Sequence, residues 1–297
     1  MKIVVGASSF AAQSDKAINI LLEKGIEVVK NPFGRKMNIP EIIEHLRDAD
    51  GLLAGLETLN EEVYRECPKL KAIARIGIGM ENVDVQAAEK RGINVSNTPD
   101  APSEAVAEMV LTALLAISRE LIQLNKDMHN KVWQKRIGFS LRNRNVLLVG
   151  YGRVGRKFAE LLKPFGANIM IYDPFQSNIS LESLNKGLEV ADIVSLHASG
   201  ADELLTKEAI KQMKKGVVIL NSARGLLINE EALVEALQTG AVSWYWSDVY
   251  SEEPYRGKLT ELDNALLTPH TATYIDRCRE EMEQEAVYNI LRDLNDV

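Results

Sequence analysis

Short apolar runs alternate with mixed segments along the first hundred residues. The runs KIVVG (2–6) and GLLA (51–54) predict buried strands, and SDKAINILLEK (14–24) has apolar residues at helical spacing, which predicts an amphipathic helix. The full series predicted here is strand 2–6, helix 14–24, strand 26–30, helix 40–48, strand 51–54, helix 60–66, strand 71–76 and strand 93–97. Alternating strands and helices favour a parallel sheet.

A second series of the same kind begins at Asn145. Six apolar runs predict strands, at 145–150, 167–172, 191–197, 216–221, 241–249 and 265–268, with helical segments between most of them. Six such strands make a complete doubly wound nucleotide-binding domain. A last helix is predicted over 276–294, and we expect it to pack against the first domain.

These patterns predict an α/β protein with two doubly wound parallel sheets. A Rossmann domain at 98–270 is inserted into a flavodoxin-like domain formed by 1–97 and 271–297, so the chain passes between domains twice. The segment 97–121 (NTPDAPSEAVAEMVLTALLAISREL) predicts a long helix that is apolar on nearly all sides. It fits a core helix of one subunit and also a helix buried between domains or subunits. The second interpretation predicts a homodimer.

Composition and charge limit the kinds of molecule that the protein is expected to bind. A chain of 297 residues with 46% hydrophobic and 26% charged residues is typical of a soluble globular protein. Its net charge of -7 argues against a nucleic-acid or anionic-membrane partner, and no apolar run reaches membrane-span length. Cys67 and Cys278 are the two cysteines, in no metal-like spacing, which argues against a zinc site or a disulfide framework. We therefore expect a cytoplasmic protein without a metal.

The stretch LLVGYGRVGRKF (147–158) contains the spacing G-x-G-x-x-G at Gly150, Gly152 and Gly155. A predicted strand precedes it and a predicted helix follows, so free N–H groups at the start of the helix can bind a pyrophosphate. Asp173 ends the next strand, where a carboxylate accepts hydrogen bonds from a ribose 2′-hydroxyl and repels a 2′-phosphate. The pattern predicts a dinucleotide site that prefers NAD to NADP.

Three residue types suited to acid–base chemistry follow later strands. Arg224 comes after strand 216–221, Glu253 comes after strand 241–249, and His270 comes after strand 265–268. Singly, each has an ordinary structural explanation. Ligands bind at the carboxyl edge of open α/β sheets, so we expect the three to converge on one site.

Six segments, in the same order and separation, resemble motifs of the D-isomer-specific 2-hydroxyacid dehydrogenases, a family that includes D-lactate, glycerate, formate and 3-phosphoglycerate dehydrogenases. The segments are RIGIGMENVD (75–84), NTPDAPSEAVAEMVL (97–111), VGYGRVG (149–155) with YDP (172–174), NSARG (221–225), DVYSEEP (248–254) and TPH (268–270). The resemblance covers nearly the whole chain. It implies hydride transfer between NAD and a 2-hydroxy or 2-oxo acid.

The resemblance also implies roles for individual residues. Arg224 would hold the carboxylate and carbonyl oxygen of a 2-oxo acid, His270 would exchange the proton, and Glu253 would hold the imidazole. The implied cofactor contacts are Gly150, Gly152, Arg153, Val154, Gly155, Asp173, His197, Ser222, Ala223 and Asp248, of which Asp248 would orient the nicotinamide carboxamide. The implied substrate contacts are Arg75 and the backbone at Ile78 and Gly79.

Two questions stay open at this point. Arg75 is similar to 3-phosphoglycerate enzymes, but LLAGLETLNEE (52–62) lacks the second arginine they often have, so 3-phosphoglycerate is one candidate substrate. The segment LHASGADELLTKEAI (196–210) is shorter than is usual in the family and has no proline, which leaves the lining of the adenosine side open. The alternative function is that of an NAD(H)-sensing, corepressor-like binding protein on the same fold.

Overall fold

The computed structural model describes residues 1–200 and 202–295 and divides into two compact units. The first unit contains Met1–Pro102 and Thr273–Val297, and the second contains Ser103–Ala272. The boundaries expected from the sequence, after 97 and after 270, lie a few residues earlier. Both units are α/β with a parallel sheet, which confirms the predicted fold class.

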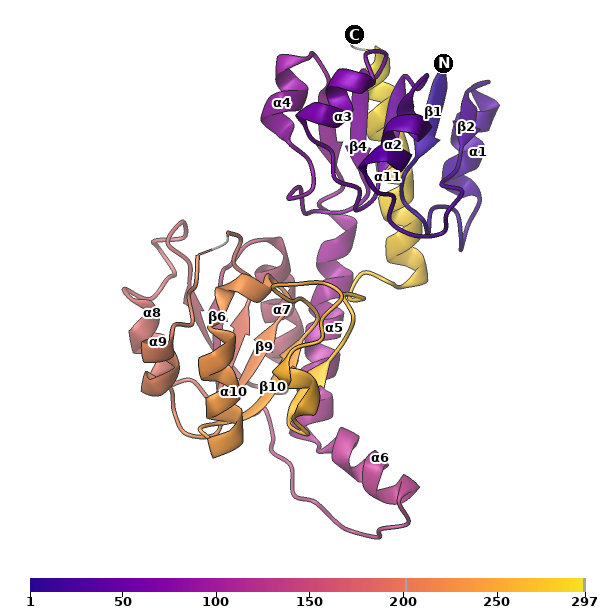
Figure 1. The fold of residues 1–297 in the computed structure, drawn as a ribbon. Coiled ribbons are helices and arrows are strands. Elements are labelled where there is room, and N and C mark those ends of the chain that lie inside the picture. Colours follow the sequence, from indigo (N-terminus) through magenta and orange to yellow (C-terminus); the bar gives the residue numbers. More distant parts are fainter. Residues whose placement is uncertain (201, 296–297) are drawn as a thin grey trace. The chain divides into compact units, whose positions relative to one another are not determined.

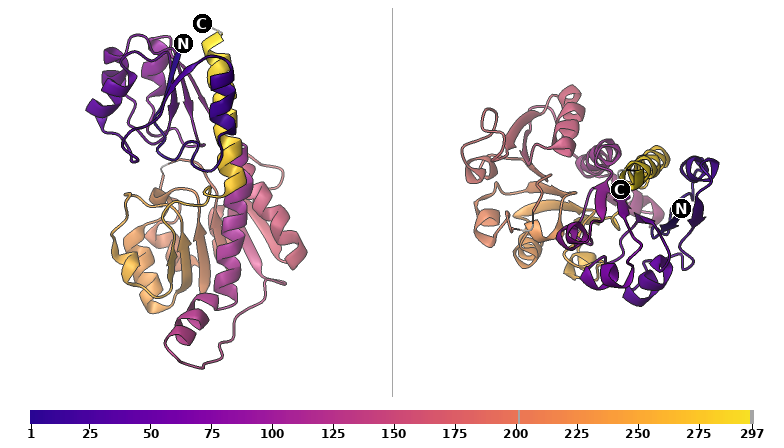
Figure 2. Two further views of the ribbon diagram at one scale, coloured as in Figure 1. Left: turned by 90° about the vertical axis from the view of Figure 1, so that its right-hand side faces the viewer. Right: turned by 90° about the horizontal axis from the view of Figure 1, so that it is seen from above.

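The first unit has a five-stranded parallel sheet in the order β2-β1-β3-β4-β5 (Figure 1). Its strands are β1 (Lys2–Val5), β2 (Glu27–Val29), β3 (Gly51–Ala54), β4 (Ala72–Arg75) and β5 (Asn94–Asn97). Its helices are α1 (Lys16–Glu23), α2 (Ile39–Leu46), α3 (Glu61–Glu66), α4 (Val85–Lys90) and α11 (Asp276–Asn295). Apolar residues of α2, α3 and α4 form a core on one face of the sheet. The last helix, α11, lies along β3, β4, β5 and α1, as predicted (Figure 2).

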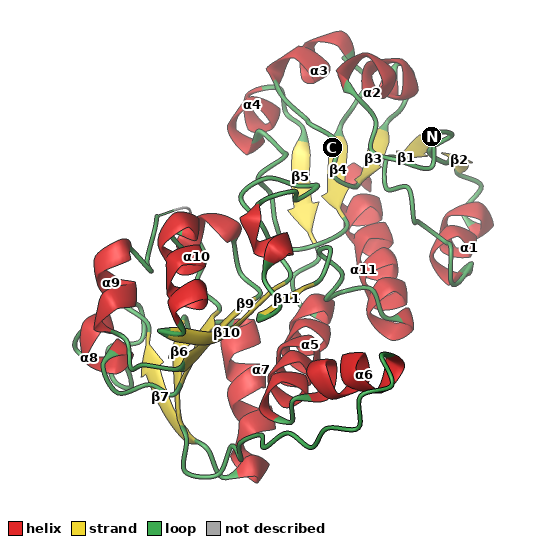
Figure 3. Ribbon diagram, turned by 60° about the horizontal axis from the view of Figure 1, so that its bottom comes forward, coloured by secondary structure: helices red, strands yellow, loops and turns green. Residues whose placement is uncertain are grey.

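The second unit has a six-stranded parallel sheet in the order β11-β10-β9-β8-β6-β7. Its strands are β6 (Asn145–Val149), β7 (Asn168–Tyr172), β8 (Ile193–Leu196), β9 (Val217–Asn221), β10 (Val242–Ser247) and β11 (Ala265–Leu267). Its helices are α5 (Ala101–Ser118), α6 (Leu121–His129), α7 (Arg153–Leu162), α8 (Leu184–Leu188), α9 (Lys207–Gln212) and α10 (Glu230–Thr239), with short 3₁₀ turns η1 (Lys163–Phe165), η2 (Gly225–Leu227) and η3 (Lys258–Glu261). Helices α5 and α7 cover one face of the sheet and α8, α9 and α10 cover the other (Figure 3).

The apolar helix α5 supplies much of the core on its face of the sheet. Its buried residues there are Val106, Ala107, Val110, Ala113, Leu114 and Ile117. By length and composition α5 could cross a membrane, and half of it is buried within the structure. Its inner side is thus core, while Met109, Leu111 and Leu115 on it are only partly buried.

The position of the first strand in each sheet determines where a ligand can bind. Strand β1 lies between β2 and β3, and β6 lies between β7 and β8. The chain therefore adds strands first on one side of the starting strand and then on the other. Open α/β sheets bind ligands in the crevice at such a switch point, outside the carboxyl ends of the strands. The two crevices are at β1/β3 and at β6/β8.

Candidate active site

The glycine turn after β6 has the geometry that its spacing predicts. Gly150 has φ +95°, and a Cβ there would lie 2.6 Å from the Ala198 nitrogen. A Cβ at Gly155 would clash with the Gly150 carbonyl oxygen, whereas a Cβ at Gly152 would meet open space. Packing thus demands the first and third glycines, and the second leaves room for a ligand to approach the backbone.

Helix α7 begins directly after this turn and fits a dinucleotide phosphate. Gly152 is its N-cap, so no side chain caps the helix, and Arg153 and Val154 form its first turn. The N–H groups of a first turn have no partners within the helix and carry its positive dipole end. A pyrophosphate would be bound by these N–H groups.

Asp173 follows β7 and lies at the glycine turn. Its Oδ2 accepts the Tyr151 N–H at 2.7 Å, and its Oδ1 accepts the Phe175 N–H at 2.9 Å. The first bond fixes the carboxylate against the turn between the first two glycines, and the second closes the loop that follows Asp173. The structure thus brings together the two parts of the predicted dinucleotide site.

His197 follows β8, is half-buried and packs against the glycine turn. Its ring packs at a tilt against Phe158 with centroids 5.4 Å apart, and its Nε2 lies 2.9 Å from the Ser195 hydroxyl. Burial lowers the pKa of His197 to about 3, so the imidazole is neutral. Its backbone also crowds Gly150, so His197 supports the turn from below.

The turn after β9 carries Ser222 and Ala223. The Ala223 N–H donates to the Asn221 side chain at 3.0 Å, and Ala223 itself is buried. Within the described residues, the buried hydroxyl of Ser222 and the Nδ1 of His197 have no hydrogen-bond partner. Buried polar atoms without protein partners fit the lining of a site that binds a polar ligand.

His270 and Glu253 form a hydrogen-bonded pair across two strand ends. The Nδ1 of His270 lies 2.9 Å from Glu253 Oε2 and 3.1 Å from Oε1, with side chains 54% and 38% exposed. The bond to Glu253 raises the pKa of His270 against the opposing effect of burial. Partial burial would raise the pKa of Glu253, but the bond and charge of His270 outweigh it, and that pKa is lowered. The pair therefore favours an imidazolium next to a carboxylate.

Asp248 anchors the segment that carries His270. Its carboxylate is buried and accepts the Thr268 hydroxyl at 2.6 Å, the Thr271 N–H at 2.9 Å and the Ala272 N–H at 2.8 Å. These three donors lie on both sides of His270 in the sequence. Asp248 therefore holds the His270 loop, in addition to the cofactor contact that the family resemblance implies.

Arg224 lies in the turn after β9, next to the loop that carries Glu253. It is half-buried, and its guanidinium donates to the Ala223 carbonyl at 2.7 Å. A Cβ at the adjacent Gly225 would clash with the backbone of Tyr250 and Ser251, so the two loops are in close contact. The charge of Arg224 acts on both Glu253 and His270. The second unit thus brings the three predicted catalytic residues to one edge of its sheet.

The predicted substrate contacts belong to the first unit. Arg75 ends β4 and donates to the Ile76 carbonyl, and its buried Nε has no partner among the described residues. Ile78 is exposed and Gly79 is half-exposed, and Asn97 donates to the Ile78 carbonyl at 2.8 Å. These three residues are therefore grouped at the carboxyl end of β4.

Sequence reasoning missed Glu57. This carboxylate is 1% exposed and accepts the Gly55 N–H at 2.7 Å at the carboxyl end of β3. Burial raises the pKa of Glu57, against the lowering effects of backbone hydrogen bonds and of the charges of Arg75 and Lys36. A glutamate in a polar stretch is ordinarily at the surface, so no local pattern singles it out.

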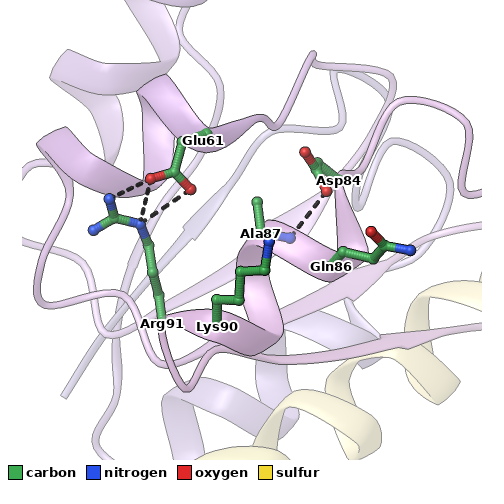
Figure 4. Close-up of a pocket in the computed structure, with 6 residues that line it drawn as sticks. All are labelled: Glu61, Asp84, Gln86, Ala87, Lys90 and Arg91. Atoms are coloured by element: carbon green, nitrogen blue, oxygen red, sulfur yellow. Dashed lines mark hydrogen bonds and ion pairs between the residues drawn. The ribbon is translucent and has the colours of Figure 1, made fainter.

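A surface hollow of about 560 Å³ lies between α3 and α4 in the first unit, and none of the predicted site residues lines it (Figure 4). It is lined by Glu61, Asp84, Gln86, Ala87, Lys90 and Arg91. Glu61 pairs with Arg91, and Asp84 caps α4 through the Ala87 N–H, so these side chains have partners within the protein. Across residues 1–200 and 202–295, no three His, Cys, Asp or Glu side chains form a group suited to a metal ion.

The chain is similar to a protein-family model, to named enzymes and to solved structures. The family model for "D-isomer specific 2-hydroxyacid dehydrogenase, NAD binding domain" matches residues 111–272. A glyoxylate reductase from Pyrococcus horikoshii is 30% identical, with 91% of this chain and 89% of that protein covered. A D-3-phosphoglycerate dehydrogenase from Methanocaldococcus jannaschii is 35% identical over 86% of this chain and 51% of that protein. The crystal structure of the TT0316 protein from Thermus thermophilus has a TM-score of 0.91 and 32% identity, covering 100% of this chain and 97% of that one.

Proposed function

Because the chain belongs to the D-isomer-specific 2-hydroxyacid dehydrogenase family, an oxidoreductase family acting on CH–OH groups with NAD(P), we propose that it interconverts a D-2-hydroxy acid and its 2-oxo acid using NAD. The observation that carries the proposal is the hydrogen-bonded pair of His270 and Glu253 beside Arg224. The pair lies at the carboxyl edge of the six-stranded sheet, and the glycine turn follows β6 at the same edge.

The three residues divide the acid–base work. The bound nicotinamide supplies or accepts the hydride. In reduction, protonated His270 gives its proton to the carbonyl oxygen of the 2-oxo acid, and in oxidation it takes the proton of the hydroxyl group. Glu253 keeps the imidazole in place and favours its protonated form. Arg224 offers parallel N–H donors to the carboxylate and carbonyl oxygens, which orients the reacting carbon.

The substrate tail is assigned to the first unit in this proposal. The backbone N–H groups at Ile78 and Gly79 hold the substrate carboxylate, and Arg75 approaches the far end of the molecule. The half-buried positive charge of Arg75 supports a tail with an anionic group, which keeps 3-phosphoglycerate as one candidate substrate. The carboxyl group of Glu57 interacts with Arg75 and, where ionised, offsets its positive charge. This interaction favours a small, uncharged tail, as in glyoxylate.

NAD is the preferred cofactor in this proposal. Asp173 is held at the glycine turn by the Tyr151 N–H, where its negative charge would repel the 2′-phosphate of NADP. The contacts proposed for the cofactor are those of the glycine turn, α7, His197, Ser222, Ala223 and Asp248. Of these, the N–H groups of α7 would hold the pyrophosphate.

A homodimer is the proposed assembly. The segment after α5 exposes large apolar side chains, including Trp133 at 83% and Ile137 at 98%. The other exposed apolar residues of this segment are Leu121, Met128 and Val132. Apolar side chains grouped in this way are typical of a protein–protein interface.

The cytoplasm is the proposed location. Cys67 and Cys278 are both free and buried. Burial raises the pKa of each thiol to about 11, so both stay protonated and unreactive at neutral pH. Free thiols are ordinary in a reducing compartment.

The experiment that tests the function is NADH oxidation by the purified protein with a panel of 2-oxo acids. The panel contains glyoxylate, hydroxypyruvate, pyruvate and 3-phosphohydroxypyruvate, each assayed with NADH and with NADPH. We expect turnover with at least one member and a preference for NADH. Tight NADH binding without turnover of any member would contradict the proposal and support the NAD(H)-sensing alternative.

A further inference from the structure

The main chain of Tyr250 lies where the three catalytic segments meet. Tyr250 is in the loop after β10, and its backbone N–H donates to Glu253 Oε1 at 3.2 Å. Its backbone also packs against Gly225, the residue that follows Arg224. Tyr250 therefore contacts the Glu253 carboxylate directly and the Arg224 turn through its neighbour.

The hydroxyl of Tyr250 reaches the third catalytic segment. It lies 2.9 Å from the Thr268 carbonyl and 3.1 Å from the Ser247 carbonyl, and its one proton is shared between them. The Thr268 carbonyl also accepts the His270 N–H at 3.0 Å. The hydroxyl thus links the ends of β10 and β11 at the atom from which the His270 turn starts.

The His270 turn needs such a link. His270 has φ +54°, in the left-handed region that costs free energy for a residue other than glycine. Its side chain is more than half exposed, so packing alone does little to fix it. A left-handed residue at a functional site persists when surrounding hydrogen bonds over-determine its conformation.

The Tyr250 ring is itself held in place. It stacks on Tyr255 with ring centroids 4.5 Å apart and planes inclined by 19°. The Tyr255 hydroxyl donates to Glu230 at 2.7 Å, which fixes the second ring. Burial raises the pKa of Tyr250, so its hydroxyl keeps its proton and remains a donor at neutral and alkaline pH.

We propose that Tyr250 is a positioning residue for the acid–base pair, one that sets the His270 imidazole and the Glu253 carboxylate at hydrogen-bonding distance. It acts through the Thr268 carbonyl and the Glu253 side chain. The inference rests on the proposed function for its catalytic consequence, but not for its effect on His270 itself. The charged groups that face His270 are Glu253, Asp248 and Arg224, and removal of the Tyr250 hydroxyl changes the charge of none of them.

The test compares Tyr250→Phe with Tyr255→Phe. Both variants lose one hydroxyl and keep the ring stack, but only the first hydroxyl reaches the His270 turn. We expect Tyr250→Phe to lower kcat about 3- to 10-fold, the scale of one lost hydrogen bond, with an unchanged Kd for NADH. The alkaline limb of its reductive pH profile should move to lower pH, because a looser Glu253 contact favours the imidazolium less. Tyr255→Phe should keep the wild-type kcat within about twofold and the wild-type pH profile.

A second readout does not depend on turnover. The pKa of His270 is measured by NMR titration of the histidine ring protons, with the His270 signal assigned from the spectrum of His270→Ala. A lower His270 pKa in Tyr250→Phe than in Tyr255→Phe supports the inference. An equal His270 pKa in the two variants overturns it, as does a loss of NADH affinity that matches the loss of kcat. Failure of the proposed function is separate and shows as absent turnover in the wild-type protein.

Discussion

The two sheets share the arrangement of strands around their first strand, but they fill the crevice beside it in opposite ways. In the first unit, the Glu57 carboxylate occupies the β1/β3 crevice, where a Cβ on Gly6 would lie 2.6 Å from it, and it accepts the Gly55 N–H. In the second unit, Gly152 leaves the β6/β8 crevice open at the start of α7. One crevice already holds a carboxyl group from its own chain, whereas the other has first-turn N–H groups directed toward a ligand.

This difference shows that strand order makes a crevice and that one side chain decides what the crevice can bind. A phosphate at the first crevice would meet the Glu57 carboxyl group and a Gly55 N–H that already donates to it. At the second crevice, the positive dipole end and the first-turn N–H groups of α7 favour a negative charge. In the proposed function the two units therefore have different roles, with dinucleotide binding and proton transfer in the second.

The largest expected effect tests whether proton transfer belongs to the second unit. His270→Ala removes the proposed proton donor and should lower kcat about 10²- to 10⁴-fold. The Kd for NADH, measured by fluorescence titration, should stay at the wild-type value. Unchanged turnover in this variant would remove His270 from the mechanism.

The next largest effect is expected from a substitution that gives the second crevice a carboxyl group, as Glu57 does in the first. Gly152→Glu places a carboxylate beside the first turn of α7, and we expect it to weaken NADH binding about 100-fold through charge repulsion and lost space. Gly152→Gln is the matched control, with the same size and no charge, and it should weaken binding less. Equal Kd values for the two variants, measured by calorimetry, would show that charge plays no part at this crevice.

A smaller effect is expected from the acid–base pair. Glu253→Gln removes the carboxylate that raises the pKa of His270, so the imidazole loses its proton at lower pH. Reduction requires the protonated form, so the alkaline limb of kcat/KM should move to lower pH, with a kcat about 10-fold lower near pH 7. An unshifted limb in the pH profile would argue against this role for Glu253.

The smallest effect concerns the carboxylate of the first crevice. The pKa of Glu57 is raised in the folded protein, so folding favours its protonated form, and this contribution is lost as the pH rises from the unfolded pKa through the folded pKa. Glu57→Gln should therefore raise Tm by a few degrees at pH 8, and the gain should shrink toward pH 4, as measured by calorimetry. If the Tm of Glu57→Gln is below that of the wild type at pH 8 and the deficit shrinks toward pH 4, the charge of Glu57 stabilises the first unit.

Local sequence was enough to predict most of the fold. Apolar runs and helical spacing predicted the parallel sheets, and the glycine spacing placed the turn before α7, because both depend on neighbouring residues. The sequence places Arg224, Glu253 and His270 directly after three strands. Their convergence was predicted from the rule that parallel strands end at one edge of a sheet. The structure brings these three within electrostatic reach of one another.

Other features depend on tertiary structure. The contact of the Tyr250 hydroxyl with Thr268 exists because β10 and β11 are neighbours, and no periodic pattern records which strands are adjacent. The burial of Glu57 likewise depends on the close approach of β1 and β3. Sequence by itself determined which elements form and which residues end each strand, since these follow from local spacing. Tertiary structure alone decided which side chains share a buried contact, since that follows from the packing of distant segments.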